Sequence, residues 1–161
     1  MSDRPHLDLS DYLPYLINRI GAAFVARYES DLAQSGLSIA MWRVLAALST
    51  SGAQRQIDVA ESTSIEVSTM SRLVTRLVSL GLVSRTRSDT NNREVNVELT
   101  PKGRALVSRL IPRARKLEAD AIAGLPPAEL AITRQTLRRM YDNMAGVADE
   151  TQEPRNLAKS G

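Results

Sequence analysis

The chain contains no cysteine, one histidine and few aromatic residues. Without cysteine it can form no disulfide, no thiolate metal site and no thiol redox switch. Aromatic residues are 4% of the 161 residues whereas hydrophobic residues are 43%, so we expect a mainly aliphatic core. No apolar run approaches the roughly 20 residues of a membrane-spanning helix, and residues 1–11 lack a signal-peptide pattern. We therefore expect a cytoplasmic protein without membrane contact.

The signatures of catalysis are also missing. There is no glycine-rich phosphate loop, no HExxH motif and no nucleophile elbow. His6 lies in an N-terminal arm without an acid or nucleophile beside it, and Glu118 and Asp120 stand i,i+2 on a predicted helix and do not face each other. No cluster of metal-ligand residues is present. These absences argue against an enzyme, a metal site and a cofactor.

Residues 63–103 carry the strongest pattern in the chain. An amphipathic helix is predicted there, with one buried apolar stripe of Met70, Leu73, Val74, Leu77 and Val78. The opposite face carries short hydroxyls and arginines, namely Ser68, Thr69, Ser71, Arg72, Thr75 and Arg76. Short hydroxyls let a helix approach a groove wall, and guanidinium groups reach phosphates or guanine edges. Arg72 and Arg76 share a face, but the pattern does not say which reads a base and which holds a phosphate. Helix capping is the alternative role for Ser68 and Thr69, and an ion pair within the domain is the alternative for Arg76.

A hairpin is predicted after this helix. Gly81 can close the helix in the left-handed conformation, with Leu82 as its hydrophobic partner. Two strand patterns follow, and in the second Val95, Val97 and Leu99 point to one side. The turn between them is flanked by Arg85, Arg87 and Arg93. Such an arm can lie along a DNA backbone or enter the minor groove. The order of helix, glycine stop and basic hairpin predicts a winged helix-turn-helix that binds double-stranded DNA; an ordinary hairpin in an α+β domain is the alternative.

Six helical segments are expected besides the two strands of the hairpin. They cover about 10–34, 37–48, 56–63, 67–80, and, beyond the hairpin, 102–123 with a last helix at 128–145. The first helix is expected to have its cap at Ser10 or Asp11 and Pro14 in its opening turn, and the second to have its cap at Ser38. In the third helix Ile57, Val59 and Ala60 are expected to point inward. The helix after the hairpin is expected to start at Thr100 and Pro101 and to be kinked at Pro112.

The predicted fold is mainly α with a small β-wing. We expect a DNA-binding domain at 36–101 and a disordered tail at 149–161. The segments on either side of the DNA-binding domain, an N-terminal helix (1–35) and the C-terminal helices (102–148), have surplus apolar surface and are assigned to dimerisation. The helix at about 67–80, here called the reading helix, is the one expected to enter the DNA groove. A homodimer would place two reading helices about 34 Å apart and would bind a pseudo-palindromic operator. A monomer with an intramolecular helical cap is the alternative.

The chain resembles the MarR family of bacterial transcription regulators. The matching strings are residues 36–48, 68–85 and 88–103, and the last carries the family's wing pattern as Asp89, Arg93, Leu99, Thr100 and Gly103. The resemblance implies that Arg93 enters the minor groove while Asp89 holds this or a neighbouring basic side chain in place. Two residues depart from the pattern: Asn92, where an aspartate is frequent, and Arg55, where the family often has a capping Ser or Thr.

The resemblance also implies a small-molecule effector, an aromatic acid or phenolic compound, bound between the helical region and the winged helix. Candidate ligand-binding residues are Tyr15, Asn18, Arg19, Trp42 and Arg43. Core packing is the alternative for Trp42, and a surface or interface ion pair is the alternative for Arg19. An acyl-CoA thioester would need further basic side chains, for which Arg113, Arg115 and Lys116 are available. The expected function is a ligand-responsive repressor, and the alternative is a winged-helix protein-interaction module that does not bind DNA.

Overall fold

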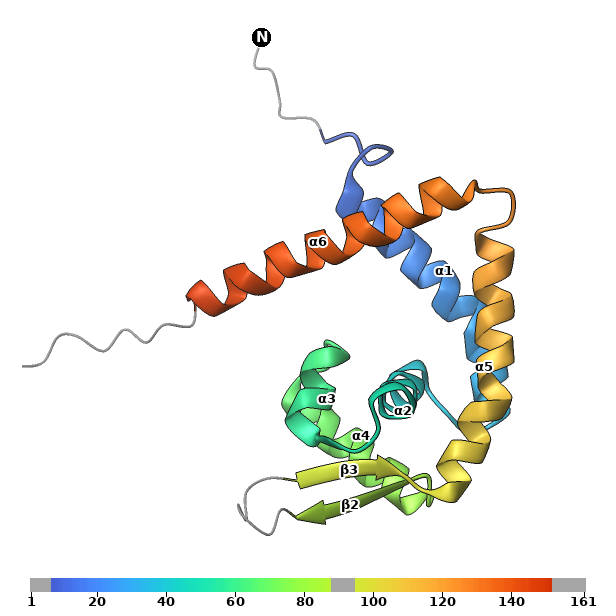
Figure 1. Cartoon of the computed structure of the whole chain (residues 1–161), viewed down its shortest axis with the longest axis vertical. Coiled ribbons are helices and arrows are strands. Elements are labelled where there is room, and N and C mark those ends of the chain that lie inside the picture. Colours follow the sequence, from blue (N-terminus) through green and yellow to red (C-terminus); the bar gives the residue numbers. More distant parts are fainter. Residues whose placement is uncertain (1–6, 88–94, 152–161) are drawn as a thin grey trace, which may run out of the picture. The chain divides into compact units, whose positions relative to one another are not determined.

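The computed structural model describes residues 7–87 and 95–151 as a mainly helical chain with a small sheet (Figure 1). The predicted fold class is therefore confirmed. The elements are α1 (Leu13–Ala33), α2 (Ile39–Ser51), β1 (Gln54–Arg55), α3 (Gln56–Ser62), α4 (Val67–Ser79), β2 (Val83–Arg87), β3 (Val95–Leu99), α5 (Pro101–Ala121) and α6 (Pro127–Thr151). The chain forms two compact units, Met1–Glu118 and Ala119–Gly161.

The sheet has three antiparallel strands in the order β1-β3-β2. The predicted pair β2 and β3 aligns Val83 with Leu99 and Arg85 with Val97. Strand β1 was not predicted; it has two residues, and Gln54 pairs with Val97. A strand this short carries no alternating pattern, so only the pairing with β3 reveals it.

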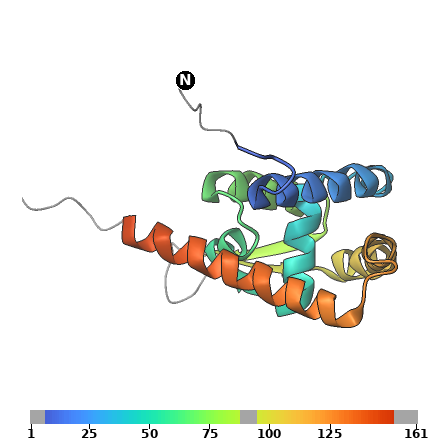
Figure 2. The same cartoon turned by 90° about the horizontal axis from the view of Figure 1, so that it is seen from above.

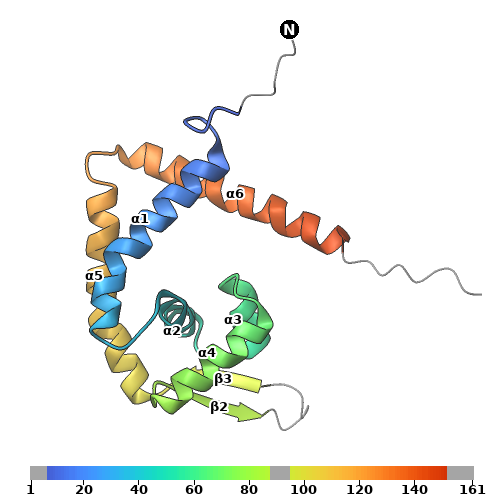
Figure 3. The ribbon, with the colours of Figure 1, turned by 180° about the vertical axis from the view of Figure 1, so that it is seen from behind.

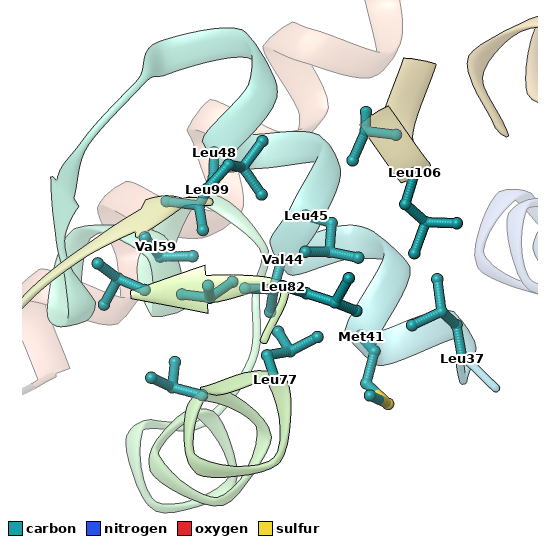
Figure 4. Packing of buried hydrophobic residues seen from close by; sticks show 14 of the residues in the cluster. Leu37, Met41, Val44, Leu45, Leu48, Val59, Leu77, Leu82, Leu99 and Leu106 are labelled. Carbon is teal, nitrogen blue, oxygen red and sulfur yellow. The ribbon is translucent and has the colours of Figure 1, made fainter. Parts of the chain in front are cut away.

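The core of the first unit lies where α2, α3, α4 and α5 meet the sheet (Figure 4). Leu45 of α2, Leu77 of α4 and Val97 of β3 have no exposed surface. The predicted stripe on α4 is confirmed at Met70, Val74 and Leu77, whereas Leu73 is only half-buried. Together these side chains hold α4 against the sheet by its apolar side.

Two residues that the sequence placed in the core are exposed. Val78 of α4 is 38% exposed and Ile57 of α3 is 55% exposed, so both predictions were wrong. Val59 and Ala60, the other apolar residues of α3, are buried as predicted. A helix of seven residues has room for only a narrow contact face, and Val59 and Ala60 occupy it.

The start of α1 also differs from the prediction. Its N-cap residue is Tyr12, which makes no capping hydrogen bond through its side chain, rather than Ser10 or Asp11. Ser10 instead donates from its N–H and from its hydroxyl to the carboxylate of Asp8, at 2.8 and 2.7 Å. Pro14 lies in the first turn as predicted, where its missing N–H costs no helical hydrogen bond. Ser10 therefore belongs to a turn with Asp8 that precedes the helix, and it does not cap the helix.

The second half of α1 is attached to α2 and α5. The Tyr28 hydroxyl donates to the Leu110 carbonyl of α5 at 3.0 Å, and the Tyr28 ring meets the Trp42 ring edge to face at 5.5 Å between centroids. Asp31 forms a 2.8 Å ion pair with Arg113 of α5. Figure 2 shows α5 end-on and α1 side-on, so the two helices cross. Burial raises the pKa of Tyr28 because desolvation penalises the phenolate.

Glycine closes two of these helices as expected. Gly36 after α1 and Gly81 after α4 both have φ of +68°. The next N–H groups fold back in the same way, from Leu37 to the Leu32 carbonyl and from Leu82 to the Leu77 carbonyl, each at 3.0 Å. The predicted cap at Ser38 of α2 is also confirmed, because its hydroxyl accepts from the Met41 N–H at 3.3 Å.

Helix α5 begins at Pro101 as predicted and has Pro112 inside it. In the second unit, α6 continues to Thr151, past its predicted end near 145 and into the segment predicted as a tail from 149. Residues 152–161 lie outside the described residues. Among the residues that the structure describes, no helix is both long and apolar enough to cross a membrane.

Candidate nucleic-acid interface

The hydrophilic face of α4 is open to solvent. Figure 3 shows α4 on the near side of the ribbon, beside the β2–β3 hairpin. All six side chains predicted for DNA contact on this helix are exposed: Ser68, Thr69, Ser71, Arg72, Thr75 and Arg76. Because Met70, Val74 and Leu77 fix the opposite side in the core, this face cannot rotate away. The structure thus brings the predicted reading-helix residues together on one surface.

Arg72 and Arg76 stand one turn apart on this face. Neither forms an ion pair with a carboxylate among the residues that the structure describes. The alternative in which Arg76 pairs within the domain therefore has no support in the described part of the chain. Within the described part of the chain, both guanidinium groups therefore keep their donors available for an external anion.

The start of α4 depends on Glu66, which the sequence pattern did not predict as a functional residue. Its carboxylate accepts from the Thr69 N–H at 3.2 Å and from the Ser68 hydroxyl. These hydrogen bonds, led by that of the Ser68 side chain, lower the pKa of Glu66 below its usual value of 4.5. Glu66 is thus the N-cap residue, a role that had been considered for Ser68 and Thr69 themselves. The clue available in the sequence was an acid directly before the helix, where the helix dipole favours negative charge.

The hydroxyls of this face differ in how they are engaged. Thr75 donates its hydroxyl hydrogen to the Ser71 carbonyl at 2.9 Å, one turn back in the same helix. Ser68 donates to Glu66, as described above. Ser71 makes no side-chain hydrogen bond among the described residues. Ser71 is therefore the hydroxyl that needs no rearrangement before it donates to a new acceptor.

The hairpin carries the second part of the predicted interface. Arg85 of β2 is exposed and makes no ion pair with the described carboxylates. Arg87 ends β2, where its backbone pairs with Val95. Asp89 and Arg93, which the family resemblance singled out, lie outside the described residues. The structure therefore describes the two strands at the base of the wing, and the roles of Asp89 and Arg93 at its tip stay predictions.

Thr100, directly before α5, and Lys102, in its first turn, attach the base of the wing to the end of α4. The Thr100 hydroxyl donates to the Gly81 carbonyl at 2.7 Å and accepts from the Gly103 N–H at 3.0 Å. Lys102 donates from its Nζ to the Leu80 carbonyl at 2.9 Å. Lys102 is not among the residues that the sequence pattern predicts for the interface. These contacts set the position of the hairpin relative to the reading helix, because β2 begins directly after Leu82.

The departure at Arg55 has a local explanation. Arg55 occupies the N-cap position of α3 but makes no side-chain cap; instead its guanidinium binds Asp58 in the first turn through two nitrogens, at 2.8 and 2.7 Å. Hydrogen bonding to Arg55 lowers the pKa of Asp58. An acid in the first turn also interacts favourably with the helix dipole. The start of α3 is thus stabilised by the charged pair instead of by a hydroxyl.

The predicted ligand-binding residues fall into two groups. On α1, the Arg19 guanidinium lies over the Tyr15 ring, 5.6 Å from its centroid, and Asn18 is exposed. On α2, Trp42 is half-buried against Tyr28 and Arg43 is exposed.

Tyr15 and Tyr28 are thirteen residues apart on one helix, which corresponds to about 20 Å along its axis. Trp42, which packs against Tyr28, therefore lies well away from Tyr15. No group of three or more potential metal ligands occurs among the described residues.

The comparisons with known proteins agree with this architecture. The family model described as the MarR family matches residues 37–95. The structure of a MarR family transcriptional regulator from Silicibacter pomeroyi is 34% identical, with 86% of this chain and 96% of that chain covered and a TM-score of 0.79. The structure of Bordetella bronchiseptica BpsR, whose DNA binding is regulated by 6-hydroxynicotinic acid, is 32% identical over 80% of this chain and 98% of that chain, with a TM-score of 0.72. The transcriptional repressor NicR of Pseudomonas putida is 26% identical over 88% of this chain and 89% of its own length. The winged helix-turn-helix described above thus belongs to a member of the MarR family of transcriptional regulators.

Proposed function

We propose that the protein is a ligand-responsive repressor that binds duplex DNA as a homodimer. The observation that carries this proposal is the exposed face of α4, with Arg72 and Arg76 unpaired by described carboxylates beside an arginine-bearing hairpin. Phosphate contacts by such cations supply sequence-independent affinity, and hydrogen bonds to base edges supply selectivity. Repression follows from a dimer that occupies promoter DNA and thereby blocks polymerase.

On the reading helix, Ser71, Arg72 and Arg76 are assigned to the major groove, where an arginine can bind a guanine in bidentate fashion. Ser68 and Thr69 enter with the N-terminal turn, and Thr75 lies between them and Arg76 on the same surface. The wing arginines Arg85, Arg87 and Arg93 are assigned to the backbone and the minor groove, with Asp89 as the carboxylate that orders the wing.

Dimerisation is proposed from apolar side chains that the chain leaves uncovered. The first half of α1 exposes Leu13, Leu16, Ile17 and Ile20, of which Ile20 is 56% exposed. In the second unit, α6 exposes Ile132, Leu137, Tyr141 and Met144, of which Met144 is 72% exposed. Contiguous apolar surface on helices at both ends of a soluble chain is stabilised by burial against a second copy. In a two-fold dimer the reading helices would stand about 34 Å apart, one turn of B-form DNA.

The effector is proposed to be a small aromatic acid. The support is the likeness to BpsR, whose DNA binding responds to 6-hydroxynicotinic acid. An effector releases DNA only if it binds one arrangement of the paired reading helices better than another. The larger alternative, an acyl-CoA thioester, is disfavoured at one candidate position, because Arg113 is already paired with Asp31 at 2.8 Å.

The test is binding to random-sequence duplex DNA across a salt series, followed by selection of genomic fragments. We expect Arg76→Ala to weaken binding to random duplex and to reduce the magnitude of the salt slope by about 1, because one phosphate contact is lost. Arg115→Ala is the matched control, since Arg115 is an exposed arginine on α5, outside the interface. Failure of the unmodified protein to bind any duplex at low salt would instead indicate a protein-interaction module.

Arg93→Ala tests the wing separately. We expect weaker binding to all duplexes with a shallower salt dependence, because the residue is assigned to the minor groove and phosphate backbone. Loss of discrimination at a single base pair with an unchanged salt slope would contradict that assignment.

A further inference from the structure

One apolar side chain stands among the polar residues at the start of the reading helix. Val67 is the first residue of α4 and is 52% exposed. It precedes Met70 by three residues and Val74 by seven, so its spacing continues the apolar stripe of the helix. Met70 and Val74 are fully buried, whereas Val67 lies outside the core that the described residues form. The stripe therefore extends beyond the core and reaches solvent at Val67.

The fold does not need Val67 to hold the start of α4. Ile65, directly before the N-cap residue Glu66, packs against the core to which Met70 belongs. Ile65 and Met70 thus occupy the two positions of a hydrophobic staple, and Glu66 supplies the cap. Valine is also a poorer helix former than alanine or leucine. Neither packing nor helix formation accounts for an exposed valine at this position.

Val67 borders the face of α4 that is assigned to DNA. Ser68 follows it directly, and Ser71 stands one helical turn further along, so a group that contacts Val67 also comes close to these hydroxyls. Arg72 and Arg76 continue the exposed surface toward the other end of the helix. Recognition helices enter the major groove with their N-terminal residues. Val67 would therefore be among the first side chains to meet a base pair.

The charge at this end of the helix favours a base over a phosphate. A helix N-terminus attracts phosphate through its free N–H groups. In this protein the Glu66 carboxylate already accepts from the Thr69 N–H at 3.2 Å and from the Ser68 hydroxyl. A phosphate beside Glu66 would be repelled by the like charge, whereas Arg72 and Arg76 can bind phosphate at a distance from it.

We propose that Val67 recognises the 5-methyl group of a thymine in the major groove. This assignment rests on the proposed function. The thymine methyl is the apolar group that base pairs present in that groove, and apolar side chains recognise it by direct contact. The branched side chain of valine has few rotamers, so little entropy is lost when it is fixed against the methyl group. An A·T pair would thus be selected at the point where α4 enters the groove.

The test removes the methyl group from the DNA and the branched side chain from the protein. A duplex that the unmodified protein selects from a random library is resynthesised with each thymine replaced, one at a time, by deoxyuridine, which lacks only the methyl group. We expect a position in each half-site at which this replacement weakens binding about fourfold, because a buried methyl group is lost. Val67→Ala should bind the thymine and deoxyuridine forms of that position with nearly equal affinity.

Two controls isolate the contact. Val78→Ala makes the same change at an exposed valine at the opposite end of α4, and it should keep the sensitivity to deoxyuridine. At the sensitive position, cytosine and 5-methylcytosine differ only in the methyl group, so the unmodified protein should bind the 5-methylcytosine duplex more tightly than the cytosine duplex.

The proposal is overturned if no thymine of the selected duplex is sensitive to deoxyuridine, if Val67→Ala is as sensitive as the unmodified protein, or if 5-methylcytosine binds no better than cytosine. Each of these results comes from a protein that binds DNA, so each leaves the proposed function standing. The deoxyuridine series on the unmodified protein does not depend on the folding of a variant. Failure to bind any duplex at low salt would refute the proposed function and this assignment with it.

Discussion

Gly103 in the first turn of α5 offers the sharpest test of how the wing is positioned. A Cβ atom at this position would overlap the Leu82 carbonyl oxygen, and would stand 3.0 Å from the Leu82 carbonyl carbon and 3.3 Å from Leu99 Cδ2. The obstructing atoms belong mainly to the backbone, which cannot rotate aside as a side chain does. Gly103→Ala should therefore force α5 away from the start of β2.

The cost can be estimated from the contacts that must yield. The Leu82 carbonyl accepts from the Thr100 N–H at 3.1 Å, so moving it strains the hydrogen bond that joins Leu82, just before β2, to Thr100, between β3 and α5. Overpacking of a well-packed site costs about 1–3 kcal/mol, and the better helix propensity of alanine recovers up to about 1 kcal/mol. We expect a net loss of about 1–2 kcal/mol in the free energy of unfolding. For a domain of this size that corresponds to a decrease in Tm of roughly 2–8 °C.

The matched control is Gly21→Ala. Gly21 lies in the middle of α1, and a Cβ there would meet nothing within 4 Å. The same chemical change should stabilise the helix by roughly 0.5–1 kcal/mol, opposite in sign to the effect at Gly103.

Both variants are measured by thermal and urea unfolding at equal protein concentration, with light scattering to verify that they share one oligomeric state. A Gly103→Ala protein as stable as the unmodified chain would refute the close approach of α5 to Leu82. Equal destabilisation by both substitutions would show that the effect is not specific to this contact.

Three further outcomes are expected. Tyr28→Phe keeps the ring and removes the hydroxyl that donates to the Leu110 carbonyl at 3.0 Å, so urea unfolding should show a loss of about 0.5–1.5 kcal/mol, and an unchanged midpoint would contradict the role of this hydrogen bond. The pKa of Glu66 is lowered, so its contribution to stability is present above its usual value of 4.5 and is lost as the pH falls from there through the lowered value. An NMR titration of the Glu66 carboxyl carbon should give a midpoint below 4.5, and a midpoint at or above that value would contradict the hydrogen bond from Ser68. Pro112→Ala should impair effector-induced release of DNA if the predicted kink in α5 takes part in the motion, and unchanged release would mean that the proline has only an architectural role.

Much of the interface was predictable because its signals are local. The 3.6-residue spacing of Met70, Val74 and Leu77 sets which side of α4 is buried, and the exposed face with Arg72 and Arg76 follows from it. Helix ends at Gly36 and Gly81 were predictable for a similar reason. Their left-handed backbone depends on the residue itself and not on distant neighbours.

The predictions that were wrong or absent concern residues whose burial or hydrogen bonding depends on packing against other elements and not on residue type. Val78 and Ile57 are as apolar as the core residues beside them, but α4 and α3 each have a limited contact face and these two lie off it. Glu66 was overlooked because hydroxyl residues also stood near the helix start, and only the geometry shows which group reaches the Thr69 N–H. Strand β1 exists only because Gln54 meets β3.

The amino-acid sequence by itself determined the order of helices and hairpin, the basic face of α4 and the family resemblance, because periodicity and turn chemistry are properties of neighbouring residues. Only the tertiary structure decided that Gly103 lies against Leu82, that Lys102 caps α4, and that Tyr28 donates to the Leu110 carbonyl. Those contacts join segments far apart in the chain. Such contacts depend on how the packed helices approach one another, which no local pattern specifies.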